Sequence, residues 1–136
     1  MIALLDVAID VPAVAASVRG PRHGAVLVFE GVARDHHDGK QVVSLFYDAY
    51  APLALREMEA IAREAGTRWP GVAVSIVHRT GPCAIGEPSV VVATGAAHRA
   101  EAYEANRFAI DELKTRVPVW KKELYADGSA WIANKA

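Results

Sequence analysis

The chain has 136 residues, a usual length for one domain, and its hydrophobic content of 52% is enough to form a sizeable core. Its 15 Lys and Arg residues are nearly balanced by 16 Asp and Glu, and the net charge of -1 gives no indication of binding to nucleic acid or to an anionic membrane. We therefore expect a single domain over residues 1–136, in which any cationic site is local.

The cysteine content and the start of the chain indicate the compartment. The single cysteine, Cys83, excludes an internal disulfide, and residues 1–9 lack the basic start and cleavage site of a signal peptide. No apolar run approaches the roughly 20 residues that cross a bilayer. These features predict a cytoplasmic protein without a membrane span.

The first part of the chain predicts strands and one short helix. Residues 2–9 are apolar and β-prone, and residues 10–12 then supply an aspartate cap and a proline for a first helical turn. Ala25–Val32 is a glycine-bounded apolar run too short for a typical helix, so we expect a buried strand. Polar residues 34–40 contain an Asp-Gly turn and predict a loop, and residues 42–50 return to a strand pattern.

The middle of the chain predicts a helix followed by two strands. Between residues 52 and 69, apolar side chains recur at spacings of three and four, which places them on one helical face: Leu55, Met58, Ala62, Ala65 and Trp69. Pro70-Gly71 ends this helix. Residues 72–78 and 89–93 have strand patterns, and the glycines and prolines of 81–88 predict a connector between them.

The last part predicts a long helix and a hairpin. The helix covers residues 97–116 and ends before Pro118, because a proline disfavours helical geometry in the residue that precedes it. Val119–Tyr125 and Ala130–Ala133 form strands on either side of an Asp-Gly turn. The elements do not alternate strictly between strand and helix, so we expect an α+β fold with a largely antiparallel sheet and about three helices.

Two lysines stand out near the helix-to-strand junction. Lys114 lies near the end of the 97–116 helix, on one stripe with Tyr103, Arg107 and Ile110. Lys121 falls on the opposite strand face from Trp120 and Leu124, so the two lysines could converge if those two side chains point into the core. A desolvated lysine near another cation loses its proton readily and can act as a base or nucleophile. The alternative is a pair of solvated surface lysines.

A second cationic pair, His98-Arg99, lies at the predicted start of the same helix. Free backbone N–H groups and the helix dipole favour an anion at this position, so the pair is a candidate phosphate site. The alternative is that His98 caps the helix and Arg99 is solvated.

The polar loop combines Arg34 with the adjacent histidines His36 and His37. Adjacent histidines point to opposite sides of an extended chain, and no recognised zinc-ligand spacing is completed elsewhere, so we predict no metal site. Arg34 remains a candidate ligand for an anion. Cys83 lies in an apolar connector without a cationic neighbour, which is typical of an inert buried thiol.

Several segments together resemble a known family. They are HRTG at 78–81, GE at 86–87, AHRAEAYEA at 97–105 and DELKTRVPVWKKE at 111–123, with GVARDHHDGKQV at 31–42 and LFYDAY at 45–50. In this order they resemble the MoaE family, the large subunits of molybdopterin synthase, over most of the chain. The pattern LKxxxPxWKxE is the most specific part.

This resemblance implies an α/β-hammerhead fold and a homodimer, flanked in a heterotetramer by two small ubiquitin-like sulfur carriers of the MoaD type. The carrier's C-terminal Gly-Gly thiocarboxylate enters the active site. Lys114 matches the lysine that meets the carrier tail, and Lys121 matches a second catalytic lysine. The substrate-holding residues, some contributed across the dimer interface, are matched by Arg34, His98 and Arg99.

The implied reaction is a sulfur transfer that converts a cyclic pterin phosphate, cyclic pyranopterin monophosphate, to molybdopterin. The two lysines would move protons while the cationic residues neutralise phosphate, and no protein-bound metal, nucleotide or redox cofactor is implied. Two alternatives remain open. The chain could be a non-catalytic module that binds an anionic metabolite or the carrier tail, or an aldolase-type enzyme that forms a Schiff base on Lys114.

Overall fold

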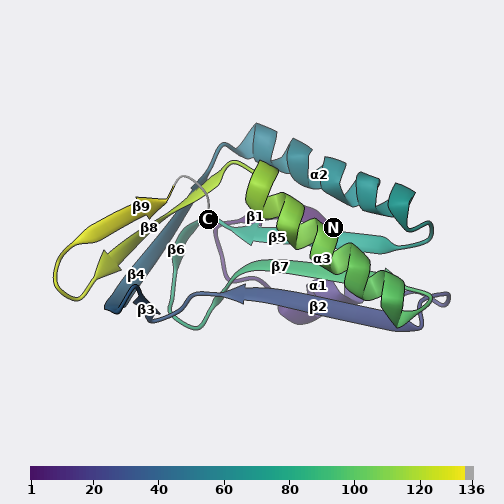
Figure 1. Cartoon of the computed structure of the whole chain (residues 1–136), viewed down its shortest axis with the longest axis horizontal. Helices are drawn as coiled ribbons and strands as arrows, with labels where there is room; N and C mark the ends of the chain where they lie inside the picture. Colours follow the sequence, from purple (N-terminus) through teal and green to yellow (C-terminus); the bar gives the residue numbers. More distant parts are fainter. Residues whose placement is uncertain (134–136) are drawn as a thin grey trace.

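A computed structural model of the protein describes residues 1–133. These residues form three helices and two groups of strands, and the smaller β-structure projects from one end of the helix-covered sheet (Figure 1). None of the helices within this range is long and apolar enough to span a membrane.

The larger body is a four-stranded sheet. Its strands lie in the order β1 (Ile2–Leu5), β5 (Ala73–Arg79), β7 (Pro88–Ala96) and β2 (Ala25–Val32), and the β1–β5 pair alone is parallel. β7 is buried along almost its whole length, because helices cover both faces of the sheet. The β2 edge, in contrast, leaves Phe29 and Val32 exposed.

The three helices divide the core into two layers. α2 (Ala51–Arg68) and α3 (Arg99–Arg116) pack on one face of the sheet (Figure 1). Met58 and Leu113 from these helices belong to the same hydrophobic core as Ile76 and Val92 from the sheet. The short α1 (Val11–Ser17) packs with alternate sheet residues on the other face. The side chain of Asp10 accepts a hydrogen bond from the Ala13 N–H and so caps α1 as expected from the sequence.

The smaller body is built around a long strand, β4 (Lys40–Ala49). It pairs with β8 (Val119–Tyr125), with β3 (His36–His37) and with β6 (Gly81–Cys83), and β9 (Ala130–Ala133) pairs with β8. Only Val117 and Pro118 separate the end of α3 from the start of β8. The last turn of α3 therefore leads directly into this sheet.

The predicted α+β class, the three helices and the largely antiparallel pairing are confirmed. Three local predictions were wrong: the 34–40 loop contains β3, the 81–88 connector contains β6, and the first strand ends at Leu5. Both missed strands are short and pair with β4, so their hydrogen bonds depend on a distant partner that local patterning does not reveal. The buried stripe of α2 also differs from the predicted one and consists of Ala54, Met58, Ile61 and Ala65.

Candidate functional site

The corner between α3 and β8 brings Lys114 and Lys121 to the same region. Lys114 lies in the last turn of α3, which ends where the Val117 N–H donates to the Leu113 carbonyl. Lys121 lies on the same face of β8 as buried Val119 and Glu123. As predicted, Lys121 and Leu124 lie on opposite faces of β8. The premise that Leu124 points into the core was wrong, because Leu124 is 39% exposed and Lys121 is on the inward face.

Lys121 lines a small pocket of about 50 Å³ next to the end of β2. The polar side chains that line it come from the β2–β3 segment, β4 and β8, and they are Arg34, His36, His37, Tyr47, Lys121 and Glu123. Arg34 and Lys121, predicted independently from the sequence, therefore share one pocket. Its floor is the carboxylate of Glu123, whose side chain is 3% exposed.

Glu123 organises the polar groups of the pocket. Its Oε1 lies 3.2 Å from Lys121 Nζ and 3.2 Å from His37 Nδ1. The buried carboxylate therefore lies beside both the Lys121 ammonium group and His37 Nδ1. The Tyr125 hydroxyl is 3.3 Å from the same nitrogen, and the ring of Trp131 packs edge-on against His37.

The electrostatic surroundings lower the pKa of Lys114. The residue as a whole is exposed, but desolvation of its ammonium group by the surrounding protein is the first cause of the lowered pKa, and the positive charge of Lys121 is the second. This places Lys114 close enough to Lys121 for their charges to interact. A lysine in such a position has a larger neutral fraction near physiological pH than an ordinary surface lysine.

Behind the lysines lies a buried histidine. His78 is fully enclosed, its Nδ1 is 2.8 Å from the Arg79 carbonyl, and burial lowers its pKa to about 4, with the charge of Lys114 contributing. Its ring packs edge-on against Tyr47, whose own pKa is raised by burial. His78 is therefore neutral near pH 7, and it donates from Nδ1.

His98 and Arg99 lie at the opposite end of α3. His98 is the N-cap residue without a side-chain capping bond, and both side chains are exposed. Lys114 follows His98 by 16 positions, which at 1.5 Å per residue is about 24 Å along the helix. The five predicted site residues thus form two groups that do not meet within one chain: Arg34, Lys114 and Lys121, and separately His98 and Arg99.

The sequence interpretation gave no role to Glu123, His37 and Tyr47. Glu123 could have been found, because it stands two residues after Lys121 and alternation places both on one strand face. His37 and Tyr47 enter the pocket through the pairing of β3 and β8 with β4, which the sequence pattern did not reveal. Across residues 1–133, His, Cys, Asp and Glu side chains form no group of three or more that could hold a metal ion.

Comparison with known proteins places the chain in a family. The family model described as "MoaE protein" matches residues 4–116. Molybdopterin synthase catalytic subunit 1 of Mycobacterium tuberculosis is 41% identical over 132 residues, covering 97% of this chain and 90% of that protein. The crystal structure of molybdopterin synthase from Staphylococcus aureus superposes with a TM-score of 0.93 at 35% identity, covering 97% of this chain and 96% of that one.

A structure of the complex of subunits 1 and 2 of molybdopterin-converting factor from Helicobacter pylori shares the fold, with a TM-score of 0.76 at 24% identity over 96% of this chain and 88% of that one. The shared architecture agrees with the family match over most of the sequence. The chain belongs to the MoaE protein family.

Proposed function

We propose that this chain is the catalytic subunit of molybdopterin synthase and converts cyclic pyranopterin monophosphate to molybdopterin. The observation that carries the proposal is the convergence of Lys114 and Lys121 beside a pocket that also contains Arg34. The sulfur would come from the C-terminal thiocarboxylate of a small ubiquitin-like carrier protein. A cytoplasmic location belongs to the same proposal and agrees with a sequence whose single cysteine, Cys83, is buried and forms no disulfide within the chain.

The groups present suit the two chemical steps. In the first, a thiocarboxylate sulfur attacks a carbon of the pterin side chain, a C–S bond forms while a C–O bond at that carbon breaks, and the departing oxygen takes up a proton or remains on the opened phosphate. The carrier is then acyl-linked to the new sulfur. In the second, water cleaves that link, which releases the carrier as a carboxylate, and the sequence runs twice to supply both sulfurs. Lys114, with its lowered pKa, can accept a proton in either step, and Lys121 presents N–H donors beside the Glu123 carboxylate. Arg34 supplies positive charge for the substrate phosphate.

A second copy of the chain would complete the site. A hollow of about 440 Å³ lies between β2 and α3 and includes the predicted stripe residues Tyr103, Arg107 and Ile110 together with Phe29. If a two-fold axis passes beside this hollow, α3 helices run in opposite directions and His98 and Arg99 of one copy approach Lys114 of the other. The homodimer is supported by this exposed apolar edge and by the separation of the two residue groups along α3.

The main alternative is a binding module that holds an anionic metabolite or the carrier tail without turnover. The same pocket would serve it, but the lowered pKa of Lys114 favours proton transfer over simple charge recognition. An aldolase-type enzyme using Lys114 is a further alternative. Reduction with borohydride in the presence of carbonyl compounds would trap its Schiff base, and absence of an adduct would exclude it.

The deciding experiment mixes the purified chain with thiocarboxylated carrier and cyclic pyranopterin monophosphate, and measures molybdopterin as its fluorescent oxidised derivative. We expect product with the wild type, none with Lys114→Ala, and normal product with Lys122→Ala, which changes an exposed lysine on the outer face of β8. If a folded wild-type chain binds the carrier without forming product, the binding-module alternative is favoured.

A further inference from the structure

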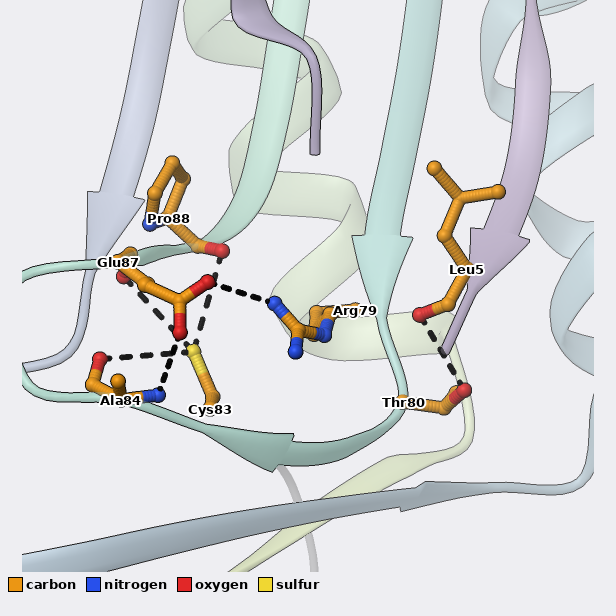
Figure 2. A network of polar contacts seen from close by, with 7 residues as sticks. All are labelled: Leu5, Arg79, Thr80, Cys83, Ala84, Glu87 and Pro88. Atoms are coloured by element: carbon orange, nitrogen blue, oxygen red, sulfur yellow. Dashed lines mark hydrogen bonds and ion pairs between the residues drawn. The ribbon is translucent and has the colours of Figure 1, made fainter. Parts of the chain in front are cut away.

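The carboxylate of Glu87 joins the end of β5 to a tight turn. Its Oε2 accepts from Arg79 Nη1 at 2.9 Å, and its Oε1 accepts from the Ala84 N–H at 3.0 Å (Figure 2). Arg79 is 9% exposed, whereas the Glu87 side chain is 31% exposed. Both bonds lower the pKa of Glu87, so the carboxylate is ionised at neutral pH.

Other contacts fix both the end of β5, which carries Arg79, and the turn that carries Glu87. On the β5 side, the Thr80 N–H donates to the Leu5 carbonyl at 2.7 Å, which fixes the strand end that carries Arg79. On the turn side, the Cys83 thiol fills the space inside residues 84–88 and lies within 3.9 Å of the Ala84 and Pro88 carbonyl oxygens (Figure 2). The ion pair therefore attaches the turn to the rigid sheet.

The same turn holds both backbone groups of Ala33. The Ala33 N–H donates to the Glu87 carbonyl at 3.0 Å, and the Gly86 N–H donates to the Ala33 carbonyl at 2.8 Å. Regular pairing of β2 with β7 ends just before this point, at a register shift between Gly31 and Val32. Ala33 is therefore held by the turn and not by the continuing sheet.

Arg34, the next residue, lines the pocket. Within residues 1–133 no carboxylate lies within ion-pair distance of its guanidinium, so its side chain is not located by a charged partner. Its position depends on the backbone at Ala33 instead. A shift of the 84–87 turn would move the starting point of the Arg34 side chain directly.

We propose that Arg79 and Glu87 are positioning residues for Arg34, which they place to receive the anionic substrate through the turn and the backbone of Ala33. The inference rests on the proposed function, because it assigns the substrate phosphate to Arg34. Neither Arg79 nor Glu87 is among the residues that line the pocket. The carboxylate is needed for this role because it accepts from the cation and from the turn at once; a glutamine would keep one acceptor and turn its amide group toward Arg79.

The test compares Glu87→Gln with Glu64→Gln in the complete synthase assay. Glu64 makes an ion pair of similar length with Arg116 between α2 and α3, and because neither residue lines the pocket, Glu64 serves as the matched control. We expect Glu87→Gln to raise KM for the pterin substrate about tenfold with kcat within about twofold, the scale of one misplaced charge-assisted hydrogen bond. Glu64→Gln should change neither constant.

A double-mutant cycle connects the effect to Arg34. If Glu87 acts through Arg34, adding Glu87→Gln to Arg34→Ala should raise KM no further. An equal additional rise in the Arg34→Ala background would overturn the inference. Glu87→Asp keeps the charge but is too short to reach both partners, and it provides an intermediate KM should Glu87→Gln fold poorly.

Amide hydrogen exchange gives a readout that does not depend on the reaction. Glu87→Gln should speed exchange at Ala33 and Gly86, and Glu64→Gln should not. Unchanged exchange at both amides would overturn the inference whatever the kinetics. If exchange is faster and Arg34→Ala has a normal KM, the failure lies in the substrate role given to Arg34 under the proposed function; if Arg34→Ala has a raised KM but Glu87→Gln does not, the positioning role alone fails.

Discussion

Lys121 Nζ and the buried carboxylate of Glu123 lie 3.2 Å apart, two residues from each other on the inward face of β8. The same carboxylate oxygen lies 3.2 Å from His37 Nδ1, and the charge of Lys121 in turn lowers the pKa of Lys114. Removing that carboxylate therefore affects more than one salt bridge.

The first prediction concerns Glu123→Gln, which keeps the size of the side chain and removes its charge. Lys121 and His37 then lose the negative charge that lies 3.2 Å from each, so the side chains proposed to take part in proton transfer lose their common charged partner. We expect kcat to fall by about one to two orders of magnitude. Single-turnover kinetics measure the change, and Glu59→Gln, at an exposed position of α2, is the control. A normal kcat in a folded Glu123→Gln variant would contradict this role.

The second prediction concerns the pKa of Lys114. Because burial is the main cause of the lowered pKa and Lys121 the second, Lys121→Gln should raise the pKa of Lys114 without restoring its ordinary value. The pH dependence of covalent labelling, followed by peptide mass spectrometry, measures this pKa. Lys122→Gln removes a charge from the adjacent residue on the exposed face and should leave it unchanged. An equal shift in both variants would mean that Lys121 has no special proximity to Lys114.

The third prediction is a pH dependence of stability caused by His78. Its pKa is about 4 in the folded chain and 6.5 without the protein environment, so between these values the unfolded chain binds a proton that the folded chain does not. The free energy of unfolding should therefore decrease as the pH falls from 6.5 to 4, by up to about 3 kcal/mol. Denaturant unfolding at a series of pH values should show a flatter dependence for His78→Gln. His98→Gln, at an exposed histidine, should retain the wild-type slope.

The fourth prediction tests whether the site spans two copies. Lys114→Ala and Arg99→Ala should each be inactive alone, because each removes one half of every site. After subunit exchange between equal amounts of the two variants, half of the dimers are mixed and each mixed dimer has one intact site, so about a quarter of wild-type activity should return. If exchange is complete by mass spectrometry and activity does not return, the two groups of residues do not work across a dimer.

Local patterns predicted the three helices and the helix-to-strand corner that carries Lys114 and Lys121, because periodicity and Pro118 determine that corner. They did not predict which face of β8 is inward: Leu124 is apolar, yet its face of the small sheet is exposed. Pairing across the chain, such as Tyr47 opposite Lys121, decides the face and needs the tertiary structure.

The spatial grouping of the site residues likewise depends on the tertiary structure and not on local sequence patterns. Arg34 lies more than 80 positions before Lys121 and still lines the same pocket, whereas His98 is much closer in the sequence to Lys114 but lies about 24 Å away along a rigid helix. The resemblance to the MoaE family indicated all five residues. It did not indicate how they are arranged within one chain.

The position of β8 between β4 and β9 has a consequence for insertions and deletions. Backbone hydrogen bonds to both neighbouring strands fix the register of β8, in which Lys121 lies opposite Tyr47 and Ala133. Loss of one residue after Pro118 would shift that frame by one and present Lys122 and Leu124 to the pocket, while Glu123 would turn outward. A chain altered in this way keeps nearly the same composition and every type of reactive group, but we expect it to be catalytically inactive.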